Sequence, residues 1–529
     1  MTQSNPYTDN PYLNNPDPNT PYTAQSKPYE TKQEDNIYTK RLKEHFSFFG
    51  IGSMIYAFFY TFCLYKNASG ITYPFFVAGT LCYFFFSMQK LGVPYKKDSI
   101  FYIVSIVLLG ISNCLTNSPQ ILFMNKCGIF LLGFLLMIHT VYMDKSWNFP
   151  KYFTAIAQMI GTVFVCIFRP CSDMISYFDA RKKEKDGKKS FFLPVLIGIV
   201  VTIPVLLFMT MLLASADAVF ADIFSRILES INIGTVFGTI FMAILVFFVS
   251  YAVYAALGMK NVKEEVTDHR TLEPIIAIIV TAALSVLYLM FSVIQILYLF
   301  IGNMQLPDGY TYSSYAREGF FQLLMVCILN LILVLVCLYL FRENKVLKVI
   351  LTIISGCTFI MILSSALRML MYINRYNLTF LRIFVLWSLA VIFLLIAGVT
   401  VFIYMNRFPL FTYSMIVVTV FYIGLSFARP DYWIAKYNLD PEHIEYLNDY
   451  DTRDSGNYLG RLSADAASIL LNEKNNPYLA QHHDLFNEEN TYDELSWLRR
   501  YYYKIEDLSE DMHIRNFNFS IYRAGKYIN

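Results

Sequence analysis

The sequence has few charged residues. Only 16% of its 529 residues are Asp, Glu, Lys or Arg, whereas soluble domains carry about 25%. The formal net charge of +2 gives no indication of a nucleic-acid partner. With 56% hydrophobic residues and a mean hydropathy of +0.43, the chain is too apolar for soluble domains of this total length. The partner that this composition predicts is the lipid bilayer.

Cysteine pairs with metal-binding or redox spacing are missing. The nine cysteines include no Cys-x-x-Cys pair, and none follows Cys357. They are interpreted as small side chains of a membrane core. His482, His483 and Asp484 are adjacent on a polar segment, a pattern typical of solvated side chains. We therefore predict no metal site and no cofactor.

Local signatures of common enzymes are missing as well. Neither HExxH nor GxSxG occurs, and the string GKKS at 187–190 lacks the upstream glycine that shapes a phosphate-binding loop. No pair of carboxylates has the spacing of a general acid and base. Enzymatic activity is therefore not predicted, and no catalytic residue is assigned.

Long apolar runs follow one another through the middle of the chain. A helix needs about 20 residues to cross about 30 Å of hydrocarbon, and its backbone groups must bond internally there. The runs lie near 46–65, 71–89, 99–115, 121–142, 152–169, 191–213, 232–258, 274–302, 319–341, 347–367, 383–404 and 408–427. We predict an all-α fold, a polytopic transmembrane helix bundle of about 11–12 spans within residues 45–427. Residues 1–44 are expected to be a disordered tail rich in Asn, Pro and Tyr, and residues 428–529 a small, polar, helical C-terminal domain.

Basic residues in the loops predict the orientation. The clusters at 40–43, 90–97 and 181–189 favour the cytoplasmic side, but five full spans cannot separate two cytoplasmic loops. The run 152–169 is the weakest, because it is short and contains Gln158. We expect it to lie in the interface or to re-enter, which leaves eleven crossings of the cell membrane and places the C-terminal domain outside the cytoplasm. The arginines at 368, 375 and 382 disagree with this orientation.

Ionisable side chains in or beside the spans are candidate functional residues, because burying one costs about 2.5–3.5 kcal/mol on insertion scales. His139 is the only histidine well inside an apolar run, where it either relays protons, binds a ligand or reaches the interface. Arg368 and Arg382 bind either an anionic substrate or, more simply, lipid phosphate. Four amides are instead expected to form hydrogen bonds between helices: Gln158, Gln295, Gln322 and Asn330.

The segment 214–230 is predicted to be an amphipathic helix at the outer membrane surface. Its apolar residues recur at four-residue steps, and Asp217 and Asp222 lie elsewhere around the helix. It serves either as a plain connection between two spans or as a lid beside an outer cavity.

Several strings, taken in order, resemble a known family. They are LLASADAVFADIF, TYSSYAREGFFQLL, SSALRMLMYINRYNLTFLRI, RPDYWIAKYNLD, YLGRLSADAASILL and IRNFNFSIYRA. Over about residues 190–525 the chain is similar to the bacterial membrane family known as domain of unknown function 4173, with its relative 4153. Ala218 departs from the pattern, because relatives usually have proline there. The matching positions are Ser215, Asp217, Phe220, Tyr312, Tyr315, Arg317, Gly319, Arg368, Tyr372, Leu378, Arg382, Pro430, Asp431, Tyr437, Asn438, Ser463, Asp465 and Ala466.

The resemblance implies a multi-pass inner-membrane protein with a polar terminal domain, and it carries no known activity. Our leading hypothesis is a non-enzymatic sensor, scaffold or assembly factor of the cell envelope, whose C-terminal domain binds a protein partner. The alternative is a transporter or lipid-handling permease that uses His139, Arg368 and Arg382. A third hypothesis, a membrane transferase acting on lipid-linked substrates, needs an outer carboxylate such as Asp217 or Glu318.

Overall fold

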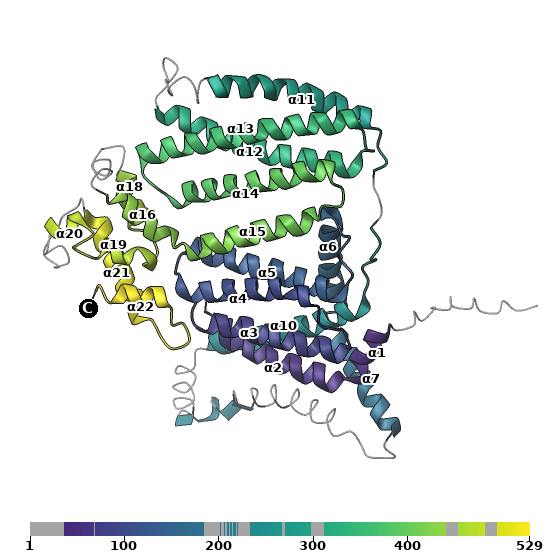
Figure 1. Ribbon diagram of the computed structural model, residues 1–529. Helices are drawn as coiled ribbons and strands as arrows, with labels where there is room; N and C mark the ends of the chain where they lie inside the picture. The colour runs from purple at the N-terminus through teal and green to yellow at the C-terminus, as the bar shows by residue number, and fades with distance from the viewer. Residues whose placement is uncertain are drawn as a thin grey trace, which may run out of the picture.

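Nine helices among the described residues are long and apolar enough to cross a membrane. The ranges that the computed structural model describes are 36–67, 69–184, 233–266, 270–297, 312–440, 453–481 and 495–528, with a few single residues between 202 and 220. Within these ranges no strand is present, and one isolated bridge joins Leu272 to Phe341. The predicted all-α membrane bundle is confirmed (Figure 1).

The nine candidate spans and helix α3 form two groups on either side of one shared helix. The first half-bundle consists of α2 (Phe46–Leu64), α3 (Thr72–Leu91), α4 (Ile100–Leu115), α5 (Pro119–Val141) and α10 (Ile233–Met259). The second consists of α11 (Pro274–Gln295), α12 (Tyr312–Leu340), α13 (Lys345–Tyr376) and α14 (Phe380–Tyr404). Helix α15 (Leu410–Phe427) packs between α14 and the pair α4 and α5 (Figure 1). Each half-bundle has its own buried apolar core.

A buried polar cluster fastens α15 to the first half-bundle. The side-chain oxygen of Asn125 accepts hydrogen bonds from Tyr422 (2.7 Å) and Ser426 (2.8 Å), and its amide donates to Ser112 (3.2 Å). Polar groups without water must find partners on neighbouring helices, so this cluster fixes how α15 sits against α4 and α5.

Local sequence signals place the helix ends. Pro119 and Pro274 occupy the first positions of α5 and α11. Proline lacks a backbone N–H, and at this position no hydrogen bond within the helix is lost. The Asn344 side chain accepts from the N–H of Val346 (2.8 Å) and so caps α13. Helix α3 ends at Gly92, whose φ of 81° is a left-handed conformation that glycine adopts without strain.

Loops from distant parts of the chain meet at one end of the bundle, here called the basic end. Lys96 Nζ donates to the carbonyl oxygen of Tyr142 (2.6 Å), and Arg270 Nη1 pairs with Glu343 Oε1 (2.6 Å). The described loop residues at this end are 92–99, 142–148, 260–266, 270–273, 341–344 and 405–409. The opposite end, here called the domain end, carries the C-terminal domain (Figure 1). The described lysines and arginines from which we predicted cytoplasmic loops lie at the basic end. The basic group at 368–382, which disagreed with the predicted orientation, does not.

Helix α6 (Phe149–Val165) does not run along the bundle. Near its start, the ring of Tyr152 stacks on Phe411 at the beginning of α15, with 3.7 Å between centroids. Just past its end, Cys166 Sγ lies 3.4 Å from Met259 Sδ at the end of α10. Both contacts are at the basic end, and Figure 1 shows α6 standing across the other helices there. The chain bends by 56° before it enters α7 (Arg169–Glu184), and such a bent pair is either a broken span or a re-entrant segment. That 152–169 does not cross the membrane therefore stays a prediction.

The C-terminal domain has its own apolar core. Its helices are α16 (Pro430–Asn438), α18 (Arg453–Leu459), α19 (Ala467–Leu470), α20 (Pro477–Gln481), α21 (Ser496–Glu510) and α22 (Phe519–Gly525). Helix α21 buries Leu498, Tyr501 and Ile505 on one face, a helical spacing that packs it against the rest of the domain.

Three features differ from the sequence-based expectation or fall outside the described residues. Residues 37–44, expected within the disordered tail, form helix α1 (Ile37–Glu44), because Leu42 is buried and Arg41 Nη1 donates to the Leu91 carbonyl (2.9 Å). The predicted crossing at 191–213 and most of the predicted helix at 214–230 lie outside the described residues. Eleven crossings therefore stay a prediction.

Candidate functional site

The predicted motif residues of the C-terminal domain lie at its junction with the bundle. Asp465 is 0% exposed, and its carboxylate accepts hydrogen bonds from the hydroxyls of Thr116, in the α4–α5 loop, and Ser520, in α22. Arg429 Nε lies 3.9 Å from Asp465 Oδ1. Burial raises the pKa of the Asp465 carboxyl, and the hydrogen bonds from Ser520 and Thr116 oppose that rise. Asp465 therefore connects the first half-bundle to two parts of the domain.

Asn518 strengthens the same contact. Its amide Nδ2 donates to the Thr116 carbonyl (2.9 Å), while its side-chain oxygen accepts from the N–H of Ser520 (2.8 Å) and so caps α22. Nearby, Asp431 accepts from the N–H of Ser463 (3.2 Å), which fixes the turn that leads into Asp465. Sequence reasoning named Asp431 and Asp465 but missed Asn518. The signal that could have found Asn518 is an asparagine at the N-cap position of a short helix.

A second clamp holds the loop between α13 and α14. The Asn438 side chain accepts from the N–H of Leu378 (2.7 Å) and donates to the carbonyl of the same residue (2.9 Å). The hydroxyl of Tyr437 donates to Asn374 (3.0 Å), and the N–H of Phe380 donates to the Tyr458 hydroxyl (2.8 Å). The domain therefore binds the second half-bundle as well as the first.

A third contact joins the domain to the α2–α3 loop. Asn67 Nδ2 donates to the Arg515 carbonyl (3.2 Å), and Arg515 Nη2 donates to the Tyr65 carbonyl (2.9 Å). The N–H of Ile71 donates to the Phe517 carbonyl (2.8 Å). Three loops from two half-bundles thus hold the domain in one orientation.

His139 belongs to a second polar cluster at the basic end. Its Nδ1 lies 2.9 Å from Asp144 Oδ2, and the Tyr152 hydroxyl donates to the same oxygen (2.8 Å). Its Nε2 is buried and has no hydrogen-bond partner among the described residues. A carboxylate at Nδ1 holds the imidazole in one tautomer and leaves the other nitrogen available as a proton acceptor. Sequence reasoning found His139 but missed Asp144 and Tyr152.

Opposing effects act on the pKa of Asp144. Burial raises it, whereas the hydrogen bonds from His139 and Tyr152 and the electrostatic interaction with His139 lower it. The lowering effects are larger in sum, so the pKa of Asp144 lies below its usual range. The carboxylate is therefore ionised at neutral pH and faces the imidazole.

The two candidate arginines are engaged with the protein itself. Arg368 Nη2 donates to Gln295 Oε1 (3.0 Å), which also accepts from Ser364 (2.6 Å). Arg382 donates to the carbonyl oxygens of Tyr376 and Asn377 at the end of α13, a position where a cation stabilises the helix terminus. These contacts account for arginines near the facing ends of α13 and α14, on the side that the charge pattern did not favour.

The remaining predicted residues are partly described. Asp217 is exposed, and its carboxylate accepts from the N–H groups of Val219 (2.7 Å) and Phe220 (3.1 Å), which is a helix-capping contact. The side chains of Asp222, Arg317 and Glu318 and the segment 482–484 lie outside the described residues. Of the four amides, Gln295 and Asn330 bond between helices as predicted, whereas Gln158 and Gln322 are exposed.

The fold and these clusters define a polytopic α-helical membrane protein with an extramembrane domain fixed to its bundle. The chain belongs to the family described as Domain of unknown function (DUF4153), whose model matches residues 103–473. This match includes His139, Arg368 and Asp465, and it ends before α21. The relation to the family numbered 4173 stays a prediction. No curated protein and no solved structure matches the chain.

Proposed function

We propose that the protein is a non-enzymatic scaffold of the cell envelope, whose C-terminal domain binds a partner protein outside the cytoplasm. One observation supports this function: the domain is held by buried and partly buried hydrogen bonds to loops of both half-bundles, at Thr116, Leu378 and Asn67. Domains of one chain usually move relative to each other unless their interface is extensive. A domain fixed in this way gives a bound partner a defined orientation to the bilayer.

The orientation is tested by cysteine labelling in intact cells. Lys474→Cys lies on the exposed surface of the domain, and Lys97→Cys is its control at the basic end; both are made together with Cys171→Ser, which removes an exposed thiol. The excess of basic residues at the basic end predicts that an impermeant maleimide labels position 474 at least tenfold more than position 97. Permeabilised cells should show equal labelling. The reverse pattern in intact cells inverts the orientation and contradicts an outer scaffold.

The partner is tested by photo-crosslinking from the domain. Benzoylphenylalanine at Tyr503, an exposed position of α21, is expected to give one protein adduct of defined mass in cells. The same amino acid at Tyr95, an exposed tyrosine at the basic end, is the matched control and should not give that adduct. Absence of any protein adduct from Tyr503 and from the exposed Ile514 argues against a scaffold.

A second function, transport across the membrane, is supported by the pair of His139 and Asp144. An imidazole oriented by a carboxylate, whose other nitrogen has no hydrogen-bond partner in the described part of the chain, is suited to accept and release a proton. The pair lies where α5 meets the basic end, so a proton-coupled transporter or lipid-handling permease would use it at that surface.

A further inference from the structure

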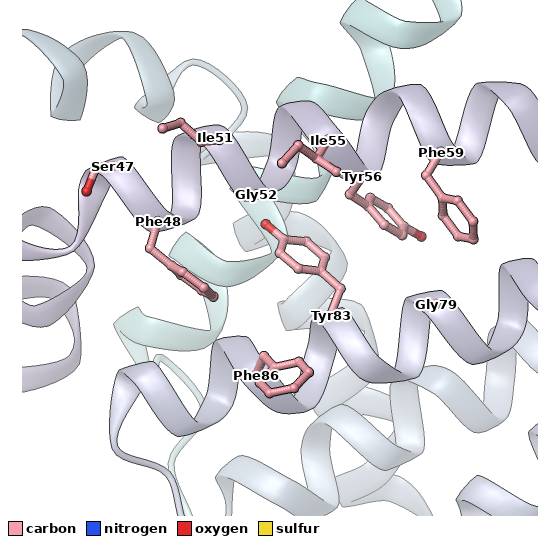
Figure 2. Close-up of a pocket in the computed structure, with 10 residues that line it drawn as sticks. All are labelled: Ser47, Phe48, Ile51, Gly52, Ile55, Tyr56, Phe59, Gly79, Tyr83 and Phe86. Atoms are coloured by element: carbon pink, nitrogen blue, oxygen red, sulfur yellow. The ribbon is translucent and has the colours of Figure 1, made fainter.

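A groove runs between α2, which is a candidate membrane span, and its neighbour α3 in the first half-bundle. Figure 2 shows its lining residues on these two neighbouring helices. Its volume is about 660 Å³, within the range of about 300–1,000 Å³ that small-molecule sites occupy. The residues that line it are Ser47, Phe48, Ile51, Gly52, Ile55, Tyr56, Phe59, Gly79, Tyr83 and Phe86.

Two glycines allow aromatic rings to lie against the opposite helix. A Cβ atom at Gly52 would lie 2.9 Å from the Tyr83 ring, and one at Gly79 would lie 2.5 Å from the Phe59 ring. The Tyr83 hydroxyl lies 3.0 Å from Ser53 Oγ, so its polar group is already satisfied within the protein. The groove therefore presents an apolar surface, and the Tyr83 hydroxyl needs no hydrogen bond from a bound molecule.

The groove faces lipid and extends toward the basic end. Ile55 on its rim is 63% exposed. From Ser47 to Phe59, twelve residues of helix span about 18 Å, which is close to the depth of one leaflet of a hydrocarbon core about 30 Å thick. A hydrocarbon chain that lies along α2 has this length and this chemistry.

A cation stands where the groove reaches the basic end. Lys90 is exposed, and its Nζ lies 5.8 Å from the centroid of the Phe48 ring, which lines the groove. Basic residues beside transmembrane helices attract anionic lipid headgroups. The position of Lys90 therefore matches an anionic group attached to a chain in the groove.

We propose that the groove between α2 and α3 binds one acyl chain of an anionic phospholipid from the surrounding bilayer, with its phosphate at the Lys90 ammonium. The apolar lining, the length along α2 and the charge at the basic end carry this assignment together. The site is separate from the clusters around Asp465 and His139 and does not depend on the proposed scaffold function.

The chain-binding part is tested by photolabelling in nanodiscs. The purified protein is placed in phosphatidylcholine with a small fraction of phosphatidylglycerol that carries a diazirine on its acyl chain. Ile55→Trp fills the groove and is expected to lower labelling of residues 47–59 and 79–86 about tenfold. Met54→Trp is the matched control, because Met54 directly precedes Ile55 in α2, is 50% exposed and does not line the groove. Equal labelling in the two variants means ordinary boundary lipid and overturns the proposal.

The headgroup part is tested by comparing the anionic probe with a phosphatidylcholine probe that has the same chain. Lys90→Gln should lower the preference for the anionic probe about fivefold, which corresponds to about 1 kcal/mol for one basic residue near the surface. Lys97→Gln, an exposed lysine of the same end, should leave the preference unchanged. If both variants keep the preference, Lys90 does not hold the phosphate and the proposal fails.

The identity of the occupant is tested with benzoylphenylalanine at Ile51, which lines the groove. Recovery of a phospholipid adduct by mass spectrometry supports the assignment. Recovery of an adduct with a peptide of the same chain, or of a covalent dimer, shows that protein occupies the groove and overturns it.

Discussion

Replacing Asp465 with alanine is expected to release the C-terminal domain from the bundle. The change leaves the buried hydroxyls of Thr116 and Ser520 without their acceptor, and a buried unsatisfied polar group costs about 1–3 kcal/mol. A combined loss of about 3 kcal/mol corresponds to an opening equilibrium about 100-fold larger. Hydrogen exchange of residues 112–118 and 463–466, measured by mass spectrometry in nanodiscs, should accelerate by about that factor.

Asp465→Asn is the control that separates charge from hydrogen bonding. Burial raises the pKa of Asp465 in the folded protein, so the folded state binds the proton more tightly than the unfolded chain. The attachment of the domain is therefore strongest at low pH and weakens as the pH rises from about 4 through the folded pKa. The asparagine variant should lose this pH dependence and keep most of the protection. Wild-type exchange rates in Asp465→Ala would show that the carboxylate does not hold the domain.

Replacing Asp144 with alanine is expected to destabilise the basic end. His139 Nδ1 and the Tyr152 hydroxyl both lose a buried partner, which costs about 2–4 kcal/mol in total. Because the folded pKa of Asp144 is lowered, its contribution to stability is present above about pH 4 and is lost as the pH falls through the folded value. Heating in detergent, followed by size exclusion, should show a lower midpoint for loss of the monodisperse protein.

Glu343→Ala is the matched control at the same end. Its carboxylate pairs with Arg270 and Lys348, but its side chain is 46% exposed, so the loss should be below about 1 kcal/mol. If Asp144→Ala is no less stable than Glu343→Ala, the buried pair of His139 and Asp144 does not stabilise the connection between α5 and α6.

The folded Asp144→Asn variant also separates transport from a structural role. Substrate-dependent flux in reconstituted vesicles that is lost in Asp144→Asn and in Arg368→Ala supports a transporter. Vesicles with the wild-type protein that carry no anionic metabolite or lipid across the bilayer exclude it, and the pair of His139 and Asp144 is then a structural element of the connection between α5 and α6.

Helix positions could be predicted from the sequence because lipid imposes length and apolarity directly. The predicted span 46–65 is α2 (Phe46–Leu64), and the predicted span 408–427 is α15 (Leu410–Phe427). Whether α6 crosses the bilayer stays a prediction, which rests on Gln158 and the charge pattern. Helix α1 could not be predicted, because it packs against helices such as α10, whose sequence lies about 200 residues away.

The polar clusters could be predicted only in part. His139 stands out because an apolar run surrounds it, but Asp144 lies outside that run and meets the imidazole only because the chain turns there. Asp465 was named through the family resemblance. Its partner Thr116 lies 349 residues away, and no local pattern in the sequence encodes such a contact.

The contact between Asn67 and Arg515 sets a delay in biogenesis. The two residues are 448 positions apart, so at about 5–20 residues per second the ribosome needs roughly 20–90 s to supply the second after the first. During that interval the loop between α2 and α3 has been synthesised, but the part of the C-terminal domain that binds it has not. The Asn67 amide therefore stays exposed to water until translation reaches residue 515. Assembly of the domain end is a late step in the folding of each new molecule.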